Sequence, residues 1–142
     1  MDTTTWDVLV AAARKHQVDP MSYNVVYVKK SLPETLKLYQ NGRVTFISYV
    51  NTGIPVMPTD NGTYPVYLRF TTQTMSGTNP NGSHYSDPGI PWVSYFNGGD
   101  ALHGFIRYSY GWPQSLGCVE MPFTHAAILW PHTPIGTLVT VQ

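Results

Sequence analysis

The stretch "TLKLYQNGRVTFISYV", from Thr35 to Val50, decides the fold class. Apolar and polar residues alternate on both sides of Gln40-Asn41-Gly42-Arg43, with the period of two that is typical of β-strands. An Asn-Gly pair between two such runs is a strong hairpin signal, because a type I′ turn needs two residues with positive φ. The stretch therefore predicts a β-hairpin.

The pattern outside this hairpin predicts a mostly β domain with short helices. Gly and Pro total 24 residues (12 and 12), which indicates many turns. We expect turns at Thr52-Gly53, at Asp60-Asn61-Gly62 and at 97–100, strands over about 63–70, 90–96 and 136–142, and a short helix that Thr124 caps.

The segment Thr74 to Gly89, "TMSGTNPNGSHYSDPG", is too polar and too rich in Gly, Asn and Pro for a core element. Its length exceeds that of ordinary connections, and such loops tend to be functional. We therefore expect a loop with a functional role.

The first residues of the chain have a helical pattern, unlike the β pattern that follows. Thr4-Thr5-Trp6-Asp7 predicts a capped helix that ends near His16, and a linker with Pro20 follows. We assign residues 1–22 to this helix and linker, and residues 23–142 to a single domain.

Composition excludes several classes of protein. The formal net charge is zero and only 11% of the 142 residues are charged, unlike the basic surface of a nucleic-acid binder. No apolar run reaches the length of a membrane span, and no signal peptide is visible. We expect a domain cut from a longer exported protein.

Cys118 is the only cysteine, so it has no internal disulfide partner. A lone cysteine is either a small buried hydrophobe or a nucleophile whose pKa is lowered by a histidine or by the N-terminus of a helix. Gly117 permits an unusual backbone next to it, and the predicted helix begins a few residues later. These neighbours favour the nucleophile.

Among five histidines, His103 is the best candidate for a base, because it ends the apolar strand "DALHG" before Gly104. His16, His84, His125 and His132 are each more typical of surface positions. Ser115 has no G-x-S-x-G motif around it, so a serine hydrolase is not supported. Histidines and the cysteine are too sparse for a zinc site, and we expect neither metal nor cofactor.

Several motifs together resemble the L,D-transpeptidase catalytic domain (YkuD-type). They are "NTGIPVMPTDNGTYPV", "IPWVSYFNGGDALHG", "SLGC" and "GTLVTV", in the order and spacing of that family, between about Tyr23 and Gln142. Papain-like and NlpC-type peptidases place the cysteine well before the histidine. Sortases need an arginine after the cysteine, and none follows Cys118.

The resemblance implies a β-sandwich-like fold and a cysteine enzyme of the cell wall, outside the cytoplasm. Such enzymes attack a peptidoglycan tetrapeptide stem, release its terminal D-amino acid and transfer the acyl group to a neighbouring stem amine through a thioester. Carbapenems are the implied inhibitors. The implied roles are Cys118 as nucleophile, His103 as a base oriented by a backbone carbonyl, Gly117 and Ser115 as oxyanion or signature positions, and Gly104, Arg107, Tyr108, Trp112 and Glu120 as substrate-binding residues.

Two positions depart from the family signature, which has histidine at Leu116 and arginine at Glu120. Glu120 reverses a charge near the nucleophile. Arg107 is either the source of the missing positive charge or a solvated strand residue. An L,D-carboxypeptidase that uses the same residues, and a peptidoglycan-binding module without chemistry, remain as alternatives.

The aromatic side chains near the site divide into two groups. We expect Trp92 and Tyr95, which lie on a predicted strand, to be core residues. We expect Tyr108, Tyr110 and Trp112 at the rim of the cleft. The acceptor amine and the choice between crosslinking and trimming are left open by the sequence.

Overall fold

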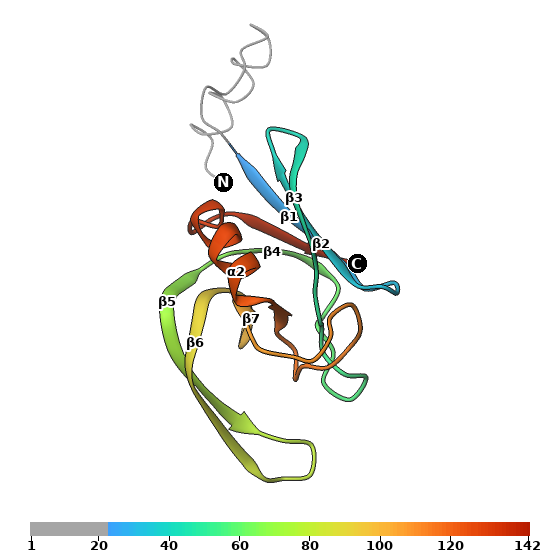
Figure 1. Cartoon of the computed structure of the whole chain (residues 1–142), viewed down its shortest axis with the longest axis vertical. Helices are drawn as coiled ribbons and strands as arrows, with labels where there is room; N and C mark the ends of the chain where they lie inside the picture. The colour runs from blue at the N-terminus through green and yellow to red at the C-terminus, as the bar shows by residue number, and fades with distance from the viewer. Residues whose placement is uncertain (1–22) are drawn as a thin grey trace, which may run out of the picture.

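Two sheets meet through the apolar faces that the period-two patterns create. The computed structural model describes residues 23–142, and these form nine strands, one short α-helix and one 3-10 turn (Figure 1). The first sheet has the order β3-β2-β1-β9-β4 and the second the order β5-β6-β7-β8. The first comprises β1 (Asn24–Lys29), β2 (Thr35–Gln40), β3 (Arg43–Tyr49), β4 (Gly62–Pro65) and β9 (Leu138–Val141); the second comprises β5 (Leu68–Thr78), β6 (His84–Asn97), β7 (Asp100–Gly104) and β8 (Val119–Met121).

The main hydrophobic core lies between the first sheet and the layer formed by β7, β8 and the helix α2 (Phe123–Leu129), which the turn Trp130–His132 follows. Val26 and Val28 of β1 are fully buried because alternate residues of the strand face this core. The fold is therefore mostly β and sandwich-like, as predicted. The other fully buried apolar members include Leu36, Leu38, Leu102, Val119, Met121, Leu129, Val139 and Val141.

The hairpin predicted from Asn41-Gly42 is confirmed. β2 and β3 pair in antiparallel register from Thr35↔Tyr49 to Gln40↔Arg43. Asn41 and Gly42 both have positive φ, 52° and 80°, as a type I′ turn requires. The closing strand is also confirmed, since β9 pairs parallel with β1.

The strand predicted over 63–70 is in fact two strands in different sheets. The N–H of Val66 donates to Thr137 O beside β9, whereas the N–H of Tyr67 donates to Tyr95 O on β6. The chain therefore crosses from the first sheet to the second between these two residues. Period-two patterning does not mark such a crossing, because both strands are extended.

The loop predicted over Thr74 to Gly89 is wrong: this segment is a β-hairpin. β5 and β6 pair through Met75↔Asp87 as far as Thr78↔His84, and the chain turns over 79–83. Figure 1 shows this end of the hairpin projecting from the body as an arm. Its strands pair only with each other here, so they need no apolar core face, and their polar composition concealed them.

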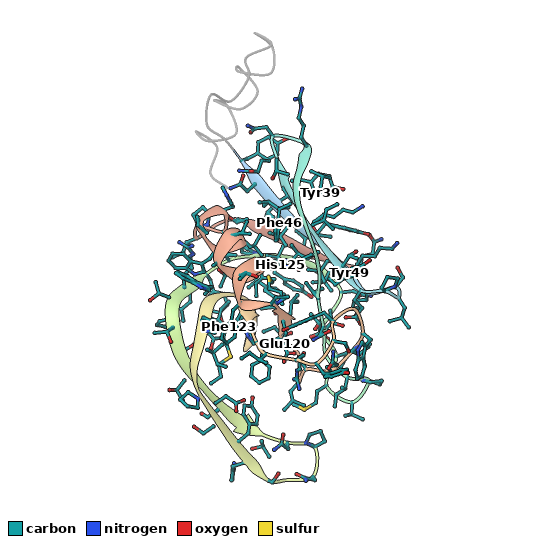
Figure 2. All side chains as sticks on the ribbon, in the orientation of Figure 1. Tyr39, Phe46, Tyr49, Glu120, Phe123 and His125 are labelled. Carbon is teal, nitrogen blue, oxygen red and sulfur yellow. The ribbon has the colours of Figure 1, made fainter. Side chains whose placement is uncertain are left out.

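The predicted helix is confirmed, but Thr124 is not its cap. The helix begins at Phe123, and Pro122 stands at the N-cap position with no side-chain hydrogen bond. Figure 2 shows His125 of this helix beside Phe46 of β3. Their rings pack edge to face, and His125 Nδ1 lies 2.7 Å from Ser48 Oγ. The contacts of His125 with Phe46 and Ser48 therefore hold α2 against the first sheet. The predicted N-terminal helix lies outside the described residues.

The segment between β3 and β4 packs tightly against the chain that leads to Cys118. Gly53 forms a bridge with Ser115, and a Cβ at Gly53 would lie 2.1 Å from Met57 O. Only a residue without a side chain fits between these backbones.

We expect Gly53→Ala to lower the free energy of unfolding by about 3 kcal/mol, because backbone atoms must move to admit the methyl group. Gly99→Ala is the matched control, since a Cβ at Gly99 has no other heavy atom within 4 Å. Urea denaturation followed by fluorescence measures both. Equal stability losses for the two variants would contradict the close packing at Gly53.

Candidate active site

The pairing of β7 with β8 puts three candidate site residues on one face of the second sheet. These strands are parallel, His103 is opposite Glu120, and Cys118 precedes Glu120 by two residues. Side chains alternate along a strand, so His103, Glu120 and Cys118 point the same way. Leu102 and Val119 point the other way, into the main core.

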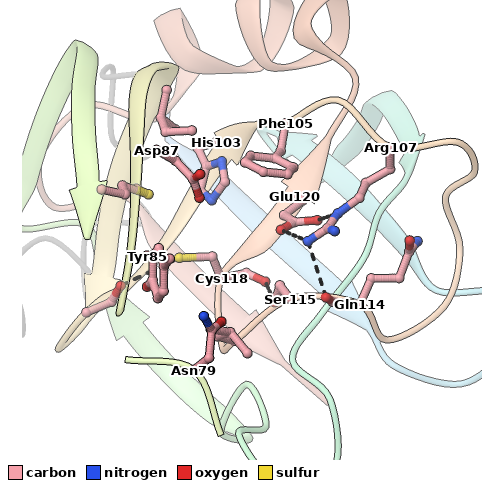
Figure 3. A pocket seen from close by; sticks show the side chains of 14 residues that line it. Asn79, Tyr85, Asp87, His103, Phe105, Arg107, Gln114, Ser115, Cys118 and Glu120 are labelled. Atoms are coloured by element: carbon pink, nitrogen blue, oxygen red, sulfur yellow. Dashed lines mark hydrogen bonds and ion pairs between the residues drawn. The ribbon is translucent and has the colours of Figure 1, made fainter. Parts of the chain in front are cut away.

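A cavity of about 320 Å³ opens on this face, and both Cys118 and His103 line it (Figure 3). Its other walls come from the arm of β5 and β6 and from the connection between β7 and β8. The other lining residues include Met75, Tyr85, Asp87, Phe105, Arg107 and Glu120.

The turn before Cys118 depends on a glycine. Gly117 has a φ of 127°, and a Cβ there would lie 2.4 Å from Asp100 Oδ1. The Ser115 hydroxyl accepts a hydrogen bond from the Gly117 N–H at 3.1 Å and donates one to Cys118 O at 2.5 Å. Ser115 and Gly117 are therefore both engaged inside the turn that presents the cysteine.

Thr59 supports this turn from the segment between β3 and β4. Its fully buried hydroxyl donates to Gly117 O at 2.6 Å and accepts from the Gly53 N–H at 3.0 Å. The N–H groups of Gln114 and Ser115 donate to Thr52 O. The position of Cys118 is thus set by a region more than fifty residues earlier in the chain.

His103 is buried and held by a backbone carbonyl, the kind of partner that the family resemblance implies for the base. Its Nδ1 lies 2.9 Å from Gly104 O, which can only accept, so Nδ1 carries the proton. Burial lowers the pKa of His103, because the charged imidazolium loses solvation. The imidazole is therefore neutral near pH 7, with the lone pair on Nε2 free to accept a proton.

The helix does not lower the pKa of Cys118. Strand β8 separates Cys118 from the start of α2, and burial raises the pKa of the thiol to about 12, with smaller effects in the same direction from Asp100 and Glu120. The resting pair is therefore a neutral thiol and a neutral imidazole. Such a thiol becomes a nucleophile only if a base takes its proton during attack.

Glu120 forms a bidentate ion pair with Arg107. Arg107 Nε and one terminal nitrogen each lie 2.8 Å from a different carboxylate oxygen, and that nitrogen also donates to Gln114 O. The Glu120 side chain is only 5% exposed, so this pair supplies the counter-charge that a buried carboxylate needs. Arg107 lies in the connection after β7 and lines the cavity, so it is not a solvated strand residue.

Other residues singled out from the sequence lie elsewhere. Gly104 is buried against Phe123, Tyr108 is fully exposed, and the half-exposed Trp112 donates to Ser109 Oγ. None of Gly104, Tyr108 and Trp112 lines the cavity, and their part in substrate binding stays a prediction.

The aromatic side chains of β6 fit the interpretation made from their strand. Trp92 packs against the main core and Tyr95 against a smaller cluster that contains Ile90, Val93 and Ala101. The Tyr110 hydroxyl donates a hydrogen bond to Phe105 O, and Tyr110 does not line the cavity.

Sequence reasoning missed some cavity residues of the arm and of the connection, namely Met75, Asp87 and Phe105. A period-two signal at Tyr85 and Asp87 exists, but the polar residues around it conceal the strand.

The described residues contain no group of three His, Cys, Asp or Glu that could hold a metal ion. No helix among them is long and apolar enough to cross a membrane.

The match to a protein-family model identifies the family of this chain. The model of the YkuD family, the L,D-transpeptidase catalytic domain, matches residues 23–141. The chain therefore belongs to this family. No curated protein sequence matches it.

Solved structures share the fold at low identity. The chain is similar to an L,D-transpeptidase from Mycobacterium smegmatis (TM-score 0.75, 19% identity, 85% of this chain and 59% of that one). It is also similar to a cysteine-to-serine mutant of Enterococcus faecium L,D-transpeptidase (TM-score 0.77, 23% identity, 84% of this chain and 50% of that one). A third similar structure is L,D-transpeptidase 3 from Mycobacterium tuberculosis with a faropenem-derived adduct (TM-score 0.74, 19% identity, 85% of this chain and 60% of that one). The chain thus spans between half and three-fifths of these proteins.

Removing Arg107 leaves the Glu120 carboxylate buried and unpaired. We expect Arg107→Met to destabilise the fold by about 3 kcal/mol at pH 8, and Arg107→Met with Glu120→Gln to recover most of that loss. Urea denaturation of the single and double variants measures this, and additive losses in the double variant would contradict the coupling.

Asp100 gives the fold a pH dependence of its own. Burial and the nearby Asp60 charge raise the pKa of Asp100 to about 7, above its unfolded value of 3.8. The raised pKa of Asp100 makes its full contribution to the free energy of unfolding below about pH 4, and this contribution is lost as the pH rises through about 7. Asp100→Asn should match the wild type at pH 4 and exceed it by about 1–2 kcal/mol at pH 8, after allowance for solvent screening. Thermal unfolding across this range tests the slope.

Proposed function

We propose that this domain catalyses acyl transfer at Cys118 on peptidoglycan stem peptides, as an L,D-transpeptidase outside the cytoplasm. One observation carries the proposal: a thiol and a neutral imidazole with a free Nε2 line the same cavity in a chain of this family. The faropenem-derived adduct of the Mycobacterium tuberculosis relative supports β-lactams of the penem type as ligands, and the imipenem complex of a further similar L,D-transpeptidase supports those of the carbapenem type.

The first step forms the thioester. Cys118 Sγ attacks the carbonyl carbon before the terminal D-amino acid, and its proton passes to His103 Nε2. The tetrahedral intermediate collapses as the carbon–nitrogen bond breaks, and the imidazolium returns the proton to the leaving amine. The products are the acyl-enzyme and a free D-amino acid.

The second step transfers the acyl group. The side-chain amine of a neighbouring stem attacks the thioester, its proton passes to His103, and the thiol regains a proton as it leaves. Water in place of the amine would give the carboxypeptidase reaction with the same residues. The Glu120 charge is no obstacle to either step, because Arg107 neutralises it.

Mass spectrometry of the intact protein tests the proposal. We expect a covalent adduct after incubation with a carbapenem, and release of D-alanine from a disaccharide-tetrapeptide, with neither for Cys118→Ala. His103→Gln should slow acylation by about 100-fold or more, the usual contribution of a general base. Because burial lowers the pKa of His103, the acylation rate should hold constant from pH 8 to pH 7 and fall only in more acidic solution.

The alternatives give different products. D-alanine release without crosslinked stems would assign the carboxypeptidase, and peptidoglycan pull-down without any adduct would assign a binding module. An adduct that survives Cys118→Ala would overturn the assignment of the nucleophile.

A further inference from the structure

Glu34 is a buried carboxylate that takes no part in the proposed reaction steps. It lies directly before β2, is only 1% exposed and does not line the cavity. Within residues 23–142 it forms no ion pair, and the Lys30 ammonium donates to Thr59 O instead. Burying a carboxylate without a paired cation is costly, so the hydrogen bonds that Glu34 accepts are essential to it.

Both carboxylate oxygens of Glu34 are used on one residue. The N–H of Thr52 donates to Oε2 at 2.7 Å, and the Thr52 hydroxyl donates to Oε1 at 2.9 Å. Burial raises the pKa of Glu34, whereas these two bonds and the charge of Lys30 oppose the rise. Thr52 is itself only 1% exposed, so Glu34 supplies the acceptors that its buried donors need.

The main chain of Glu34 ties the same segment to the connection between β7 and β8. Its N–H donates to Gly111 O at 2.6 Å, and its carbonyl oxygen accepts from the N–H of Val50 at 3.1 Å. The Gly111 N–H in turn donates to Val50 O. Glu34 therefore joins the connection before β2, the chain after β3 and the connection that leads to Cys118.

Thr52 passes this constraint to the nucleophile. Its carbonyl oxygen accepts from the N–H groups of Gln114 and Ser115 at 2.9 and 3.0 Å, and the Ser115 hydroxyl donates to Cys118 O. Direct hydrogen bonds thus lead from the Glu34 carboxylate, by way of Thr52, to the turn before Cys118. Loss of the carboxylate would leave the Thr52 donors buried and unpaired, and the segment would shift to satisfy them.

We propose that Glu34 is a positioning residue, which acts through Thr52 to fix the turn that presents the Cys118 thiol to the cavity. This inference rests on the proposed acyl transfer. A misplacement of about 1 Å can cost on the order of 100-fold in rate. Because neither Glu34 nor Thr52 lines the cavity, the loss should fall on the rate constant of acylation and not on ligand binding.

The experiment follows acylation by a carbapenem at pH 8 over a range of concentrations, by mass spectrometry of the intact protein. Glu34→Met removes the acceptors at similar length. Glu34→Gln keeps one oxygen for the Thr52 N–H and places an amide NH₂ group against the Thr52 hydroxyl oxygen. We expect Glu34→Met to lower the saturating rate by about tenfold or more at an unchanged half-saturating concentration, and Glu34→Gln to stay within about threefold of the wild type.

Thr133→Val is the matched control for lost buried hydrogen bonds. Thr133 is fully buried, and its hydroxyl forms hydrogen bonds with Ser94 Oγ and Trp130 O, outside the cavity lining. We expect Thr133→Val to lose stability but keep the wild-type acylation rate at a temperature at which it is folded. Thr52→Val should slow acylation and Thr52→Ser should restore it, and this pair carries the test if Glu34→Met does not fold.

Three results would overturn the inference. Wild-type acylation rates for both Glu34→Met and Thr52→Val would remove the positioning role. Equal slowing by Glu34→Met and Thr133→Val would assign the loss to stability alone. A raised half-saturating concentration at an unchanged saturating rate would assign Glu34 to ligand binding.

Alkylation of Cys118 by iodoacetamide separates this inference from the proposed function. If the carbapenem does not acylate the wild type, the proposed acyl transfer is overturned, and the alkylation rates then decide the positioning role. Slower alkylation of Glu34→Met than of the wild type and Thr133→Val would support that role, because the thiol has lost its alignment with the base. Equal alkylation of the three proteins would overturn it.

Discussion

Parallel pairing of β7 with β8 demands a crossover, because parallel neighbours cannot be joined by a tight turn. Here the crossover is the connection 105–118, which leaves the sheet after His103 and Gly104 and returns at Cys118. The His103 imidazole thus lies at the end of one strand and the Cys118 thiol at the start of its neighbour. The register that buries Leu102 and Val119 in the core turns the side chains of His103 and Cys118 to the opposite face.

Burial favours the uncharged forms of Cys118 and His103 and leaves Glu120 in need of a counter-charge. It raises the pKa of the Cys118 thiol to about 12 and lowers the pKa of His103. A buried carboxylate in the same sheet is tolerable only with a partner, and Arg107 reaches Glu120 from the crossover. The glutamate at the signature position is therefore one half of a local ion pair.

The parts predicted correctly from the sequence are those that local chemistry determines. Asn41-Gly42 requires positive φ twice, and the alternation around it has a core to face, so the hairpin was predictable. The motif that carries Cys118 and His103 was equally visible. Its agreement with the family follows from the match over residues 23–141.

The errors arise where tertiary structure decides. The arm was taken for a loop because its strands do not face the main core, and Asp87 was missed with it. The helix was expected to lower the pKa of Cys118, but sequence proximity to Phe123 does not show that β8 intervenes. The ion pair of Arg107 with Glu120 depends on a crossover path that no local pattern reveals.

The arm of β5 and β6 has a consequence for how this domain can change over evolution. Its outer part hydrogen-bonds only within itself and contributes wall residues to the cavity but none to the main core. Substitutions there escape the packing constraints that govern Leu102 or Val119. Ligand preference can thus drift in the arm while the scaffold that aligns thiol and imidazole is inherited unchanged.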